Sequence, residues 1–198
     1  MADQIVQCSL CLDTQITLPC TLSCGHIFCY VCIKNVSFSR DNRTLIFCPL
    51  CRNRQSIQEL YQLVDPASIQ KEMEFLQGRT FVWIYANSFQ KDRWWCCDSQ
   101  TSEILEMEYN NGARNIKIDI GCKNYEFDLL LMEQHKTCGQ SHNRRLRRIH
   151  RNNLPETNLC GIAGIWLVGY TGFPSAFSNQ TVAAPPQSTG NCSSLSSD

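Results

Sequence analysis

The chain has 198 residues, a length that fits one or two domains. Its 18 lysines and arginines are balanced by 18 aspartates and glutamates, so no global field attracts nucleic acid or an anionic membrane. The longest apolar run, residues 159–170, falls short of the roughly 20 residues that a membrane-spanning helix needs. These features argue against a membrane partner and against a sequence-specific nucleic-acid partner.

Cysteine spacing is the strongest signal near the N-terminus. Of the 14 cysteines, seven form the motifs CSLC, CGHIFCYVC and CPLC between residues 8 and 51. Each CxxC pair lets two thiolates reach one ion from a tight turn, and tetrahedral zinc takes four such ligands. The order of the pairs predicts two interleaved zinc sites, one on Cys8, Cys11, Cys29 and Cys32, and the other on Cys24, His26, Cys48 and Cys51.

A disulfide framework is the alternative explanation for so many cysteines. The N-terminal segment MADQIVQC holds no apolar run of the kind found in a secretory signal. We therefore expect a reducing compartment, the cytosol or also the nucleus, in which cysteines are thiols or metal ligands. Cys20 competes with Cys24 as a ligand, but only Cys24 stands two residues before His26, where both side chains can turn to one ion. Cys20 is predicted to be a small buried residue.

The ligand order resembles that of a RING finger, a zinc-stabilised cross-brace that recruits ubiquitin-conjugating enzymes. Residues 5–54 would form this finger, and its small core makes the metal a main source of folding free energy. The resemblance implies that Leu10 and Pro49 form an apolar shelf for the conjugating enzyme. It also implies that the guanidinium fork of Arg52 holds that enzyme and ubiquitin together. The alternatives are core packing for Leu10 and plain surface exposure for Arg52.

Residues 55–77 predict an ordered helical connector. Apolar residues recur at helical spacing from Ile57 to Leu63, until Pro66 interrupts the pattern and a new helical segment can begin. A second domain is expected over residues 78–166. The tail, residues 167–198, is rich in Ser, Pro and Gly and is predicted to be disordered.

The second domain is predicted to be a small α+β unit of aromatic strands around one helix. Alternation along the first strand places Trp83 in the core. In chain order the expected elements are a strand over 81–85, an aromatic strand from 93, a helix from 101 to 112, a strand over 115–120, an apolar segment over 125–134 and a basic strand over 144–148. The complete fold class is therefore α+β, a RING cross-brace followed by a domain with a strongly bent sheet.

Trp83, Trp95 and Glu106 stand at the name-giving positions of a WWE domain. A RING finger followed by a WWE domain is similar to the RING–WWE ubiquitin ligases of the Iduna type, which are switched on by poly(ADP-ribose). The resemblance covers roughly residues 5–166. It implies a pocket for iso-ADP-ribose, whose two phosphate groups and adenine require fixed donors, positive charge and an aromatic wall. The implied pocket residues are Tyr85, Trp95, Tyr125, Gln134 and Arg144, with Lys34 facing the ligand from the finger.

Two positions near this pocket depart from the family pattern. The turn before the second strand differs in length, so either Lys91 or Arg93 is a candidate for a second cation. The family has a lysine where this chain has Cys160, a change that removes a phosphate ligand and would cost on the order of 1 kcal/mol. Contact with nucleic-acid phosphates is the alternative use of the five arginines within residues 144–151.

The predicted function is that of a RING-type ubiquitin ligase directed by poly(ADP-ribose), which marks ADP-ribosylated proteins for proteasomal degradation. Two zinc ions are the expected cofactors. The expected partners are a conjugating enzyme carrying ubiquitin, poly(ADP-ribose) and poly(ADP-ribosyl)ated proteins. The cysteines outside the finger lack the His or Asp context of a nucleophile, so no covalent ubiquitin–cysteine intermediate is expected. The alternative is a non-catalytic, zinc-dependent scaffold whose WWE domain binds a protein partner.

Overall fold

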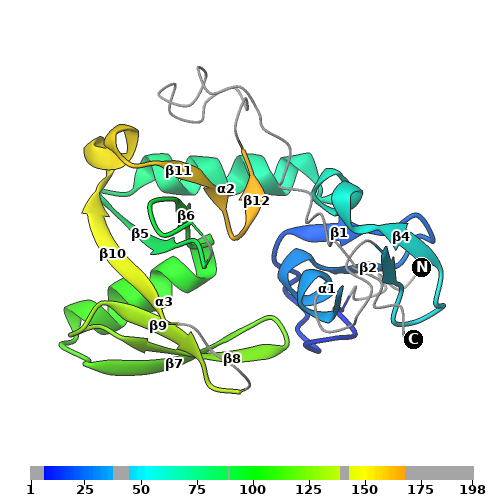
Figure 1. Cartoon of the computed structure of the whole chain (residues 1–198), viewed down its shortest axis with the longest axis horizontal. Coiled ribbons are helices and arrows are strands. Elements are labelled where there is room, and N and C mark those ends of the chain that lie inside the picture. The colour runs from blue at the N-terminus through cyan, green and yellow to red at the C-terminus, as the bar shows by residue number, and fades with distance from the viewer. Residues whose placement is uncertain (1–6, 38–44, 89, 139–142, 168–198) are drawn as a thin grey trace, which may run out of the picture.

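A computed structural model of the chain describes residues 7–37, 45–88, 90–138 and 143–167. Two parts lie side by side in Figure 1: a small finger that holds the N-terminal elements, and a larger bent sheet. A long helix runs from the finger along one edge of the larger part. Except for Leu167, the tail predicted from the sequence lies outside the described residues.

The finger is built from short elements, two antiparallel ribbons and one helix. They are β1 (Pro19–Thr21), β2 (Ile27–Cys29), α1 (Tyr30–Ser37), β3 (Leu45–Phe47) and β4 (Arg54–Ser56). Cys20 on β1 lies opposite Phe28 on β2, and both side chains are fully buried. Strands of three residues provide little backbone pairing, which leaves the cysteine clusters to hold the loops together.

The connector consists of the 3₁₀ helix η1 (Ile57–Leu63) and the α-helix α2 (Pro66–Gly78). The carboxylate of Asp65 caps α2 by accepting hydrogen bonds from the amides of Ala67 and Ser68, and Pro66 occupies the first helical position. A proline is favourable there because that N–H would have no partner within the helix. The proline that interrupts the helical pattern of the sequence therefore begins the next helix.

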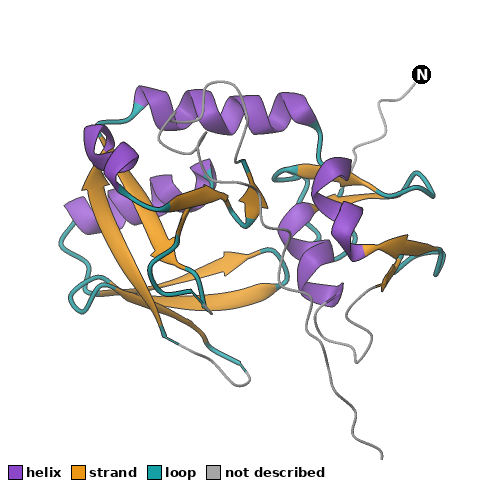
Figure 2. Ribbon diagram, turned by 45° about the horizontal axis from the view of Figure 1, so that its top comes forward, coloured by secondary structure: helices purple, strands orange, loops and turns teal. Residues whose placement is uncertain are grey.

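The second part is an eight-stranded sheet with one α-helix. Its elements are β5 (Phe81–Ala86), β6 (Trp94–Cys96), α3 (Ser99–Asn110), β7 (Asn115–Ile120), β8 (Lys123–Asp128), β9 (Glu133–Lys136), β10 (Arg144–His150), the 3₁₀ helix η2 (Arg151–Glu156), β11 (Leu159–Ile162) and β12 (Ile165–Trp166). The strand order is β12-β11-β6-β5-β10-β9-β8-β7, with β11 and β6 parallel. The sheet is strongly bent, and α3 lies inside the bend (Figure 2).

The structure changes the bounds of one predicted element of this part and adds detail to two others. The predicted helix begins at Ser99 rather than residue 101, because Asp98 caps it and accepts from the amide and hydroxyl of Thr101 at 2.9 and 3.0 Å. The segment 125–134 forms parts of two strands, separated by a turn in which Asp128 accepts from two backbone amides. The basic strand β10 is central in the sheet, between β5 and β9, and two further strands, β11 and β12, follow it in the chain.

Both faces of β5 are buried, and this joins the two parts of the molecule. Val82 and Ile84 pack in a hydrophobic cluster that also contains Cys20 and Ile33 of the finger. Trp83, on the other face, packs with α3 in a second cluster, in agreement with the predicted alternation. The finger and the sheet therefore share a continuous core, which fixes their relative orientation.

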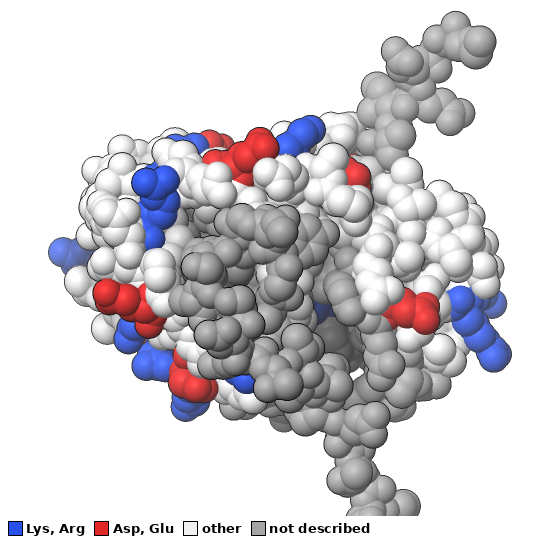
Figure 3. Space-filling model, turned by 90° about the horizontal axis from the view of Figure 1, so that it is seen from above, with Lys and Arg blue, Asp and Glu red and all other residues white. Residues whose placement is uncertain are grey.

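The surface carries charges of both signs. On the face shown in Figure 3, lysines and arginines are interspersed with acidic residues and form no large patch of one sign among the described residues. No described helix combines the length and the apolar character needed to cross a membrane.

Candidate zinc centres and interdomain ligand site

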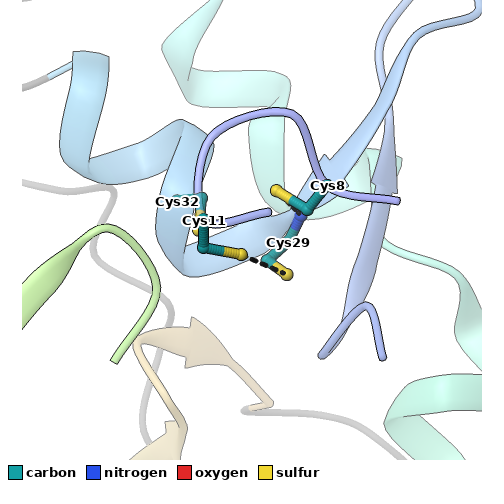
Figure 4. Close-up of side chains that lie close together, drawn as sticks. All are labelled: Cys8, Cys11, Cys29 and Cys32. Carbon is teal, nitrogen blue, oxygen red and sulfur yellow. Dashed lines mark hydrogen bonds between the residues drawn. The ribbon is translucent and has the colours of Figure 1, made fainter. Parts of the chain in front are cut away.

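The structure brings the eight predicted metal ligands together in two groups of four. Within each group all ligand atoms lie within 4.8 Å of one another. Figure 4 shows the first group, in which a loop before β1 and the junction of β2 with α1 supply the four sulfurs. The groups are Cys8, Cys11, Cys29 and Cys32, and Cys24, His26, Cys48 and Cys51.

The interatomic distances fit tetrahedral zinc. Bonds of about 2.3 Å from zinc to sulfur separate two ligand sulfurs by about 3.8 Å. The sulfurs of Cys11 and Cys29 are 3.9 Å apart, whereas a disulfide requires about 2.05 Å. At the second centre, Nδ1 of His26 lies 3.3 Å from the sulfur of Cys24 and 3.5 Å from that of Cys48. Both groups therefore fit a zinc ion, which would hold the loops of the finger and take no part in a reaction.

The turns that carry the ligands have matching backbone geometry. Leu12 follows the first CxxC pair and Arg52 follows the last, and each has φ near 62°. Their amides donate to the carbonyls of Cys8 and Cys48 at 2.7 and 2.8 Å. Gly25 has φ of 81°, which lets Cys24 and His26 turn toward the same point.

Cys20 lies outside both metal groups. Its sulfur is fully buried and is 3.7 Å from the carbonyl oxygen of Leu60, to which it donates. Burial raises the pKa of the Cys20 thiol to about 12. A buried thiol that keeps its proton fits the core of the finger rather than a metal site.

The three residues predicted to contact a conjugating enzyme sit on the two zinc loops of the finger. Pro49 and Arg52 are exposed. Leu10 is half-buried, packs against the core of the finger and also lines a cavity of about 500 Å³. Ile104, Ile118 and other residues of the second part form the opposite wall of that cavity. Contact of these residues with a conjugating enzyme stays a prediction.

The predicted pocket residues of the second part come together on one face of the sheet. Tyr85 pairs with Trp95, and Gln134 pairs with Arg144 in the neighbouring ladder. The Arg144 guanidinium lies over the Tyr85 ring, 5.6 Å from its centroid. Tyr125 packs in the cluster on this face, and Gln134 is almost completely buried. None of these residues lines the cavity next to Leu10.

Lys34 reaches this face from the finger. Its ammonium donates to the carbonyl of Gly164 at 3.1 Å and lies 6.0 Å from the centroid of the Trp95 ring. The hydroxyl of Tyr30 donates to the same carbonyl, also at 3.1 Å. Burial, followed by the positive charge of Arg144, lowers the pKa of Lys34 to about 8. The finger thus contributes a cation to a site that is otherwise formed by the sheet.

The site is basic. Within the described ranges, neither Lys34 nor Arg144 forms a salt bridge with a carboxylate. Lys136 adds a further cation, 5.9 Å from the Tyr125 centroid, which the sequence analysis did not identify. Burial and the charges of Lys123 and Arg144 lower the pKa of Lys136. Alternation along β9 places residues 134 and 136 on one face, and this signal was available in the sequence.

The structure also distinguishes the two candidates for a further cation. Arg93 is half-buried, with its guanidinium 5.7 Å from the centroid of Trp166. Lys91 is exposed, and its backbone carbonyl accepts a hydrogen bond from Arg145. Arg93 is therefore the candidate that faces the site.

The remaining arginines of β10 have structural partners. Arg145 and Arg147 lie over Trp94 on the opposite face of the sheet, at 5.2 and 4.5 Å from its centroid. Arg148 donates to both oxygens of Glu106, which also accepts from the indole of Trp83 at 2.9 Å. The arginines thus alternate between two faces, an arrangement that does not favour the nucleic-acid alternative.

Comparisons with known proteins agree with this division of the molecule. The family described as "Zinc finger, C3HC4 type (RING finger)" matches residues 8–51, and the family described as "WWE domain" matches residues 81–148. The chain is 31% identical over 163 residues to "E3 ubiquitin-protein ligase RNF146" of Rattus norvegicus, a match covering 80% of this chain and 42% of that protein.

Matches of the same kind are found in other vertebrates. The human protein of that name is also 31% identical over 163 residues, with 41% of its length covered, and in Xenopus tropicalis the covered share is 47%. The chain thus spans less than half the length of these curated relatives. With its two zinc groups and its bent sheet around one helix, the chain contains a RING finger followed by a WWE domain.

Proposed function

We propose that this chain is a RING-type ubiquitin ligase whose activity is directed by poly(ADP-ribose) bound at the WWE domain. The observation that carries the proposal is the meeting of Lys34, from the RING finger, with Trp95 and Arg144 of the WWE domain at one basic, aromatic site. A ligand in this site contacts both domains. The similarity to proteins named E3 ubiquitin-protein ligase RNF146 supports the ligase activity.

The RING finger contributes position rather than a reacting group. The exposed loop with Pro49 and Arg52 suits the docking of a conjugating enzyme. A lysine amine of the substrate then attacks the ubiquitin thioester, forms an isopeptide bond, and releases the thiol of the conjugating enzyme. Holding the thioester in a reactive pose lowers the entropic part of the barrier. Arg52 supplies a fork of donors that can bridge the enzyme and ubiquitin.

The WWE site contributes recognition of an anion. Lys34 and Arg144 contact a carbonyl and aromatic faces, which are weaker partners for a cation than a phosphate is. Iso-ADP-ribose replaces these partners with charge-assisted hydrogen bonds. Because Lys34 belongs to the finger, the ligand favours one arrangement of the two domains through differential contacts. In the cytosol or nucleus, the polymer would thereby direct ubiquitin to ADP-ribosylated proteins, which the proteasome degrades.

The test measures discharge of ubiquitin from a loaded conjugating enzyme by the full chain, with and without iso-ADP-ribose. Arg52→Ala should slow discharge by about tenfold or more, equivalent to at least ~1.4 kcal/mol in the barrier. Arg144→Ala should abolish the response to iso-ADP-ribose, because water cannot replace its charge-assisted hydrogen bonds to the ligand.

Two neighbouring arginines serve as controls. Arg54→Ala, two residues after Arg52 and also exposed, should leave discharge nearly unchanged. Arg145→Ala, on the opposite face of β10 from Arg144, should retain the response to the ligand. A wild-type chain with no discharge activity would favour the non-catalytic scaffold instead.

A further inference from the structure

The strand β7 forms one edge of the eight-stranded sheet. It has six residues and pairs with β8 on one side, and no strand among the described residues lies on its other side. The opposite edge is β12, whose two residues offer little backbone for a further pairing. An edge strand presents amide and carbonyl groups that can pair with another chain. β7 is therefore the edge to which a further strand can be added.

The direction of the outer backbone groups of β7 follows from its pairing with β8. The amide of Leu129 donates to the carbonyl of Arg114 at 2.7 Å, so Arg114 directs its backbone groups toward β8. In antiparallel strands this direction alternates from one residue to the next. Asn115, Lys117 and Asp119 therefore direct their amides and carbonyls away from β8. Over the described ranges, these backbone groups have no hydrogen-bond partner.

The sequence of β7 is complementary to a second β7 that runs antiparallel to it. With a two-fold axis at Ile118, Lys117 lies opposite the partner's Asp119, and the two residues can exchange backbone hydrogen bonds because both face outward. Ile116 then lies opposite the partner's Ile120 on the other face. An axis at residue 117 or 119 would place two like charges opposite each other, which is unfavourable. Charge thus selects one register.

Exposure along the strand fits this arrangement. Lys117 and Asp119 are exposed, and Lys117 belongs to no salt bridge in the part of the chain that the structure describes. The Asp119 carboxylate accepts a hydrogen bond from the exposed side chain of Asn124. Ile116 and Ile120 are only half-buried, although both pack against the second hydrophobic cluster. A second copy would cover these isoleucines and pair both charges.

We propose that two copies of this chain associate through their β7 strands, with the two-fold axis at Ile118. The sheet continues from one copy into the other, and each copy contributes the same surface, as in other two-fold interfaces. Charges of one sign would protect the edge from pairing, whereas the alternating signs of Lys117 and Asp119 attract an identical strand. Because six residues of each copy form a small interface, the dimer is weak and depends on concentration.

The test is analytical ultracentrifugation of the full chain from about 1 µM to about 1 mM, the range in which weak dimers form. The wild type should change from monomer to dimer as its concentration rises. Lys117→Glu places like charges at both contacts across the axis and should weaken dimerisation by about tenfold or more. Combining Lys117→Glu with Asp119→Lys should restore it, because opposite charges again face each other.

A mixture of the two single variants tests the register directly. Lys117→Glu alone sets two acidic residues at each contact, and Asp119→Lys alone sets two lysines there. In a mixed pair, both contacts join opposite charges. The equimolar mixture should therefore dimerise more tightly than either variant alone.

Lys71→Glu is the matched control, because it makes the same charge change at an exposed position of α2 and should leave dimerisation unchanged. Lys117→Met removes the contact without adding repulsion from Glu126, which lies opposite residue 117 on β8, and should weaken dimerisation by a smaller factor. Thermal melting and zinc content show that each variant is folded.

Three results would overturn the inference. The first is a wild type that stays monomeric throughout the range. The second is a dimer that both Lys117→Glu and Lys117→Met leave intact, because the copies would then meet at another surface. The third is a mixture that dimerises no more tightly than the single variants, because residues 117 and 119 would then not face each other.

Discussion

Glu106 shows how one side chain can organise a domain. It accepts hydrogen bonds from the buried indole of Trp83 and from two nitrogens of Arg148, between 2.6 and 2.9 Å. Arg148 also lies over the rings of Phe81 and Tyr109. This group connects α3 to β5 and β10. Two of the three name-giving residues of the domain thus stabilise its fold, whereas the third, Trp95, faces the proposed ligand site.

Glu106→Gln should lower the free energy of unfolding by about 2 kcal/mol, because a neutral amide cannot accept the charge-assisted bonds of Arg148. Urea denaturation of the full chain measures this change. Glu103→Gln is the control, since Glu103 pairs with Arg79 at a more exposed position and surface ion pairs contribute little. Equal effects of the two substitutions would contradict a special role for Glu106.

The same carboxylate predicts a dependence on pH. Hydrogen bonding from Arg148 lowers the pKa of Glu106 in the folded state below the ordinary 4.5. The unfolded chain therefore binds the proton first, and the stabilisation is present above about pH 4.5 and is lost as the pH falls through the lower folded-state value. The stability difference between wild type and Glu106→Gln should accordingly narrow below pH 4.5. A difference that is constant down to pH 3 would be inconsistent with this assignment.

At the scale of elements, the sequence was most informative where geometry is local. A CxxC turn places two sulfurs by itself, so the eight ligands could be assigned from spacing alone. The start of α3 was less certain, since Asp98 and Thr101 are both residues that cap helices. The central place of β10 depends on pairing between distant strands, which no local pattern records. The hydrogen bond from Lys34 to Gly164 likewise joins residues far apart in the chain, so the sequence alone could not predict it.

The two zinc centres predict different outcomes for two neighbouring cysteines. Cys24→Ser should reduce zinc content from two ions to one per chain, because only three ligands remain at that centre. Cys20→Ser should retain both ions, because Cys20 belongs to neither group of ligands. Its sulfur contacts the carbonyl of Leu60, so the substitution should affect only the packing there. Elemental analysis of the purified variants decides between them. Equal loss of zinc from both would mean that the ligand assignment is wrong.

At the scale of the whole molecule, the hairpin turn between β7 and β8 packs against the first zinc centre. A Cβ atom at Gly121 would lie 2.8 Å from the sulfur of Cys32, a predicted ligand that a bound ion would hold in place. The turn itself would therefore have to move. The space available at Gly121 in the sheet therefore depends on where the metal holds Cys32 in the finger.

Gly121→Ala should separate the finger from the WWE domain and weaken the response of ligase activity to iso-ADP-ribose, with zinc content unchanged. Gly112→Ala is a matched control: both glycines have positive φ, but a Cβ at Gly112 meets nothing within 4 Å. Each substitution should cost about 1 kcal/mol of backbone strain. Hydrogen exchange at the interface should increase only in Gly121→Ala. The same exchange pattern in both variants would show that strain, not the contact, is responsible.

The hairpin of β11 and β12 has a consequence for how the molecule is made. The match to the WWE family ends at residue 148. Beyond it, the carbonyl of Gly164 accepts the hydrogen bond from Lys34, and the ring of Trp166 packs edge to face on Trp95. During synthesis, all eight metal ligands have left the ribosome once Cys51 has emerged. The hairpin follows more than a hundred residues later. The nascent finger can therefore bind zinc early. Lys34 can form its hydrogen bond to Gly164 only after β11 and β12 have been synthesised. Unfinished chains would carry a folded RING without the ligand site that is proposed to control it.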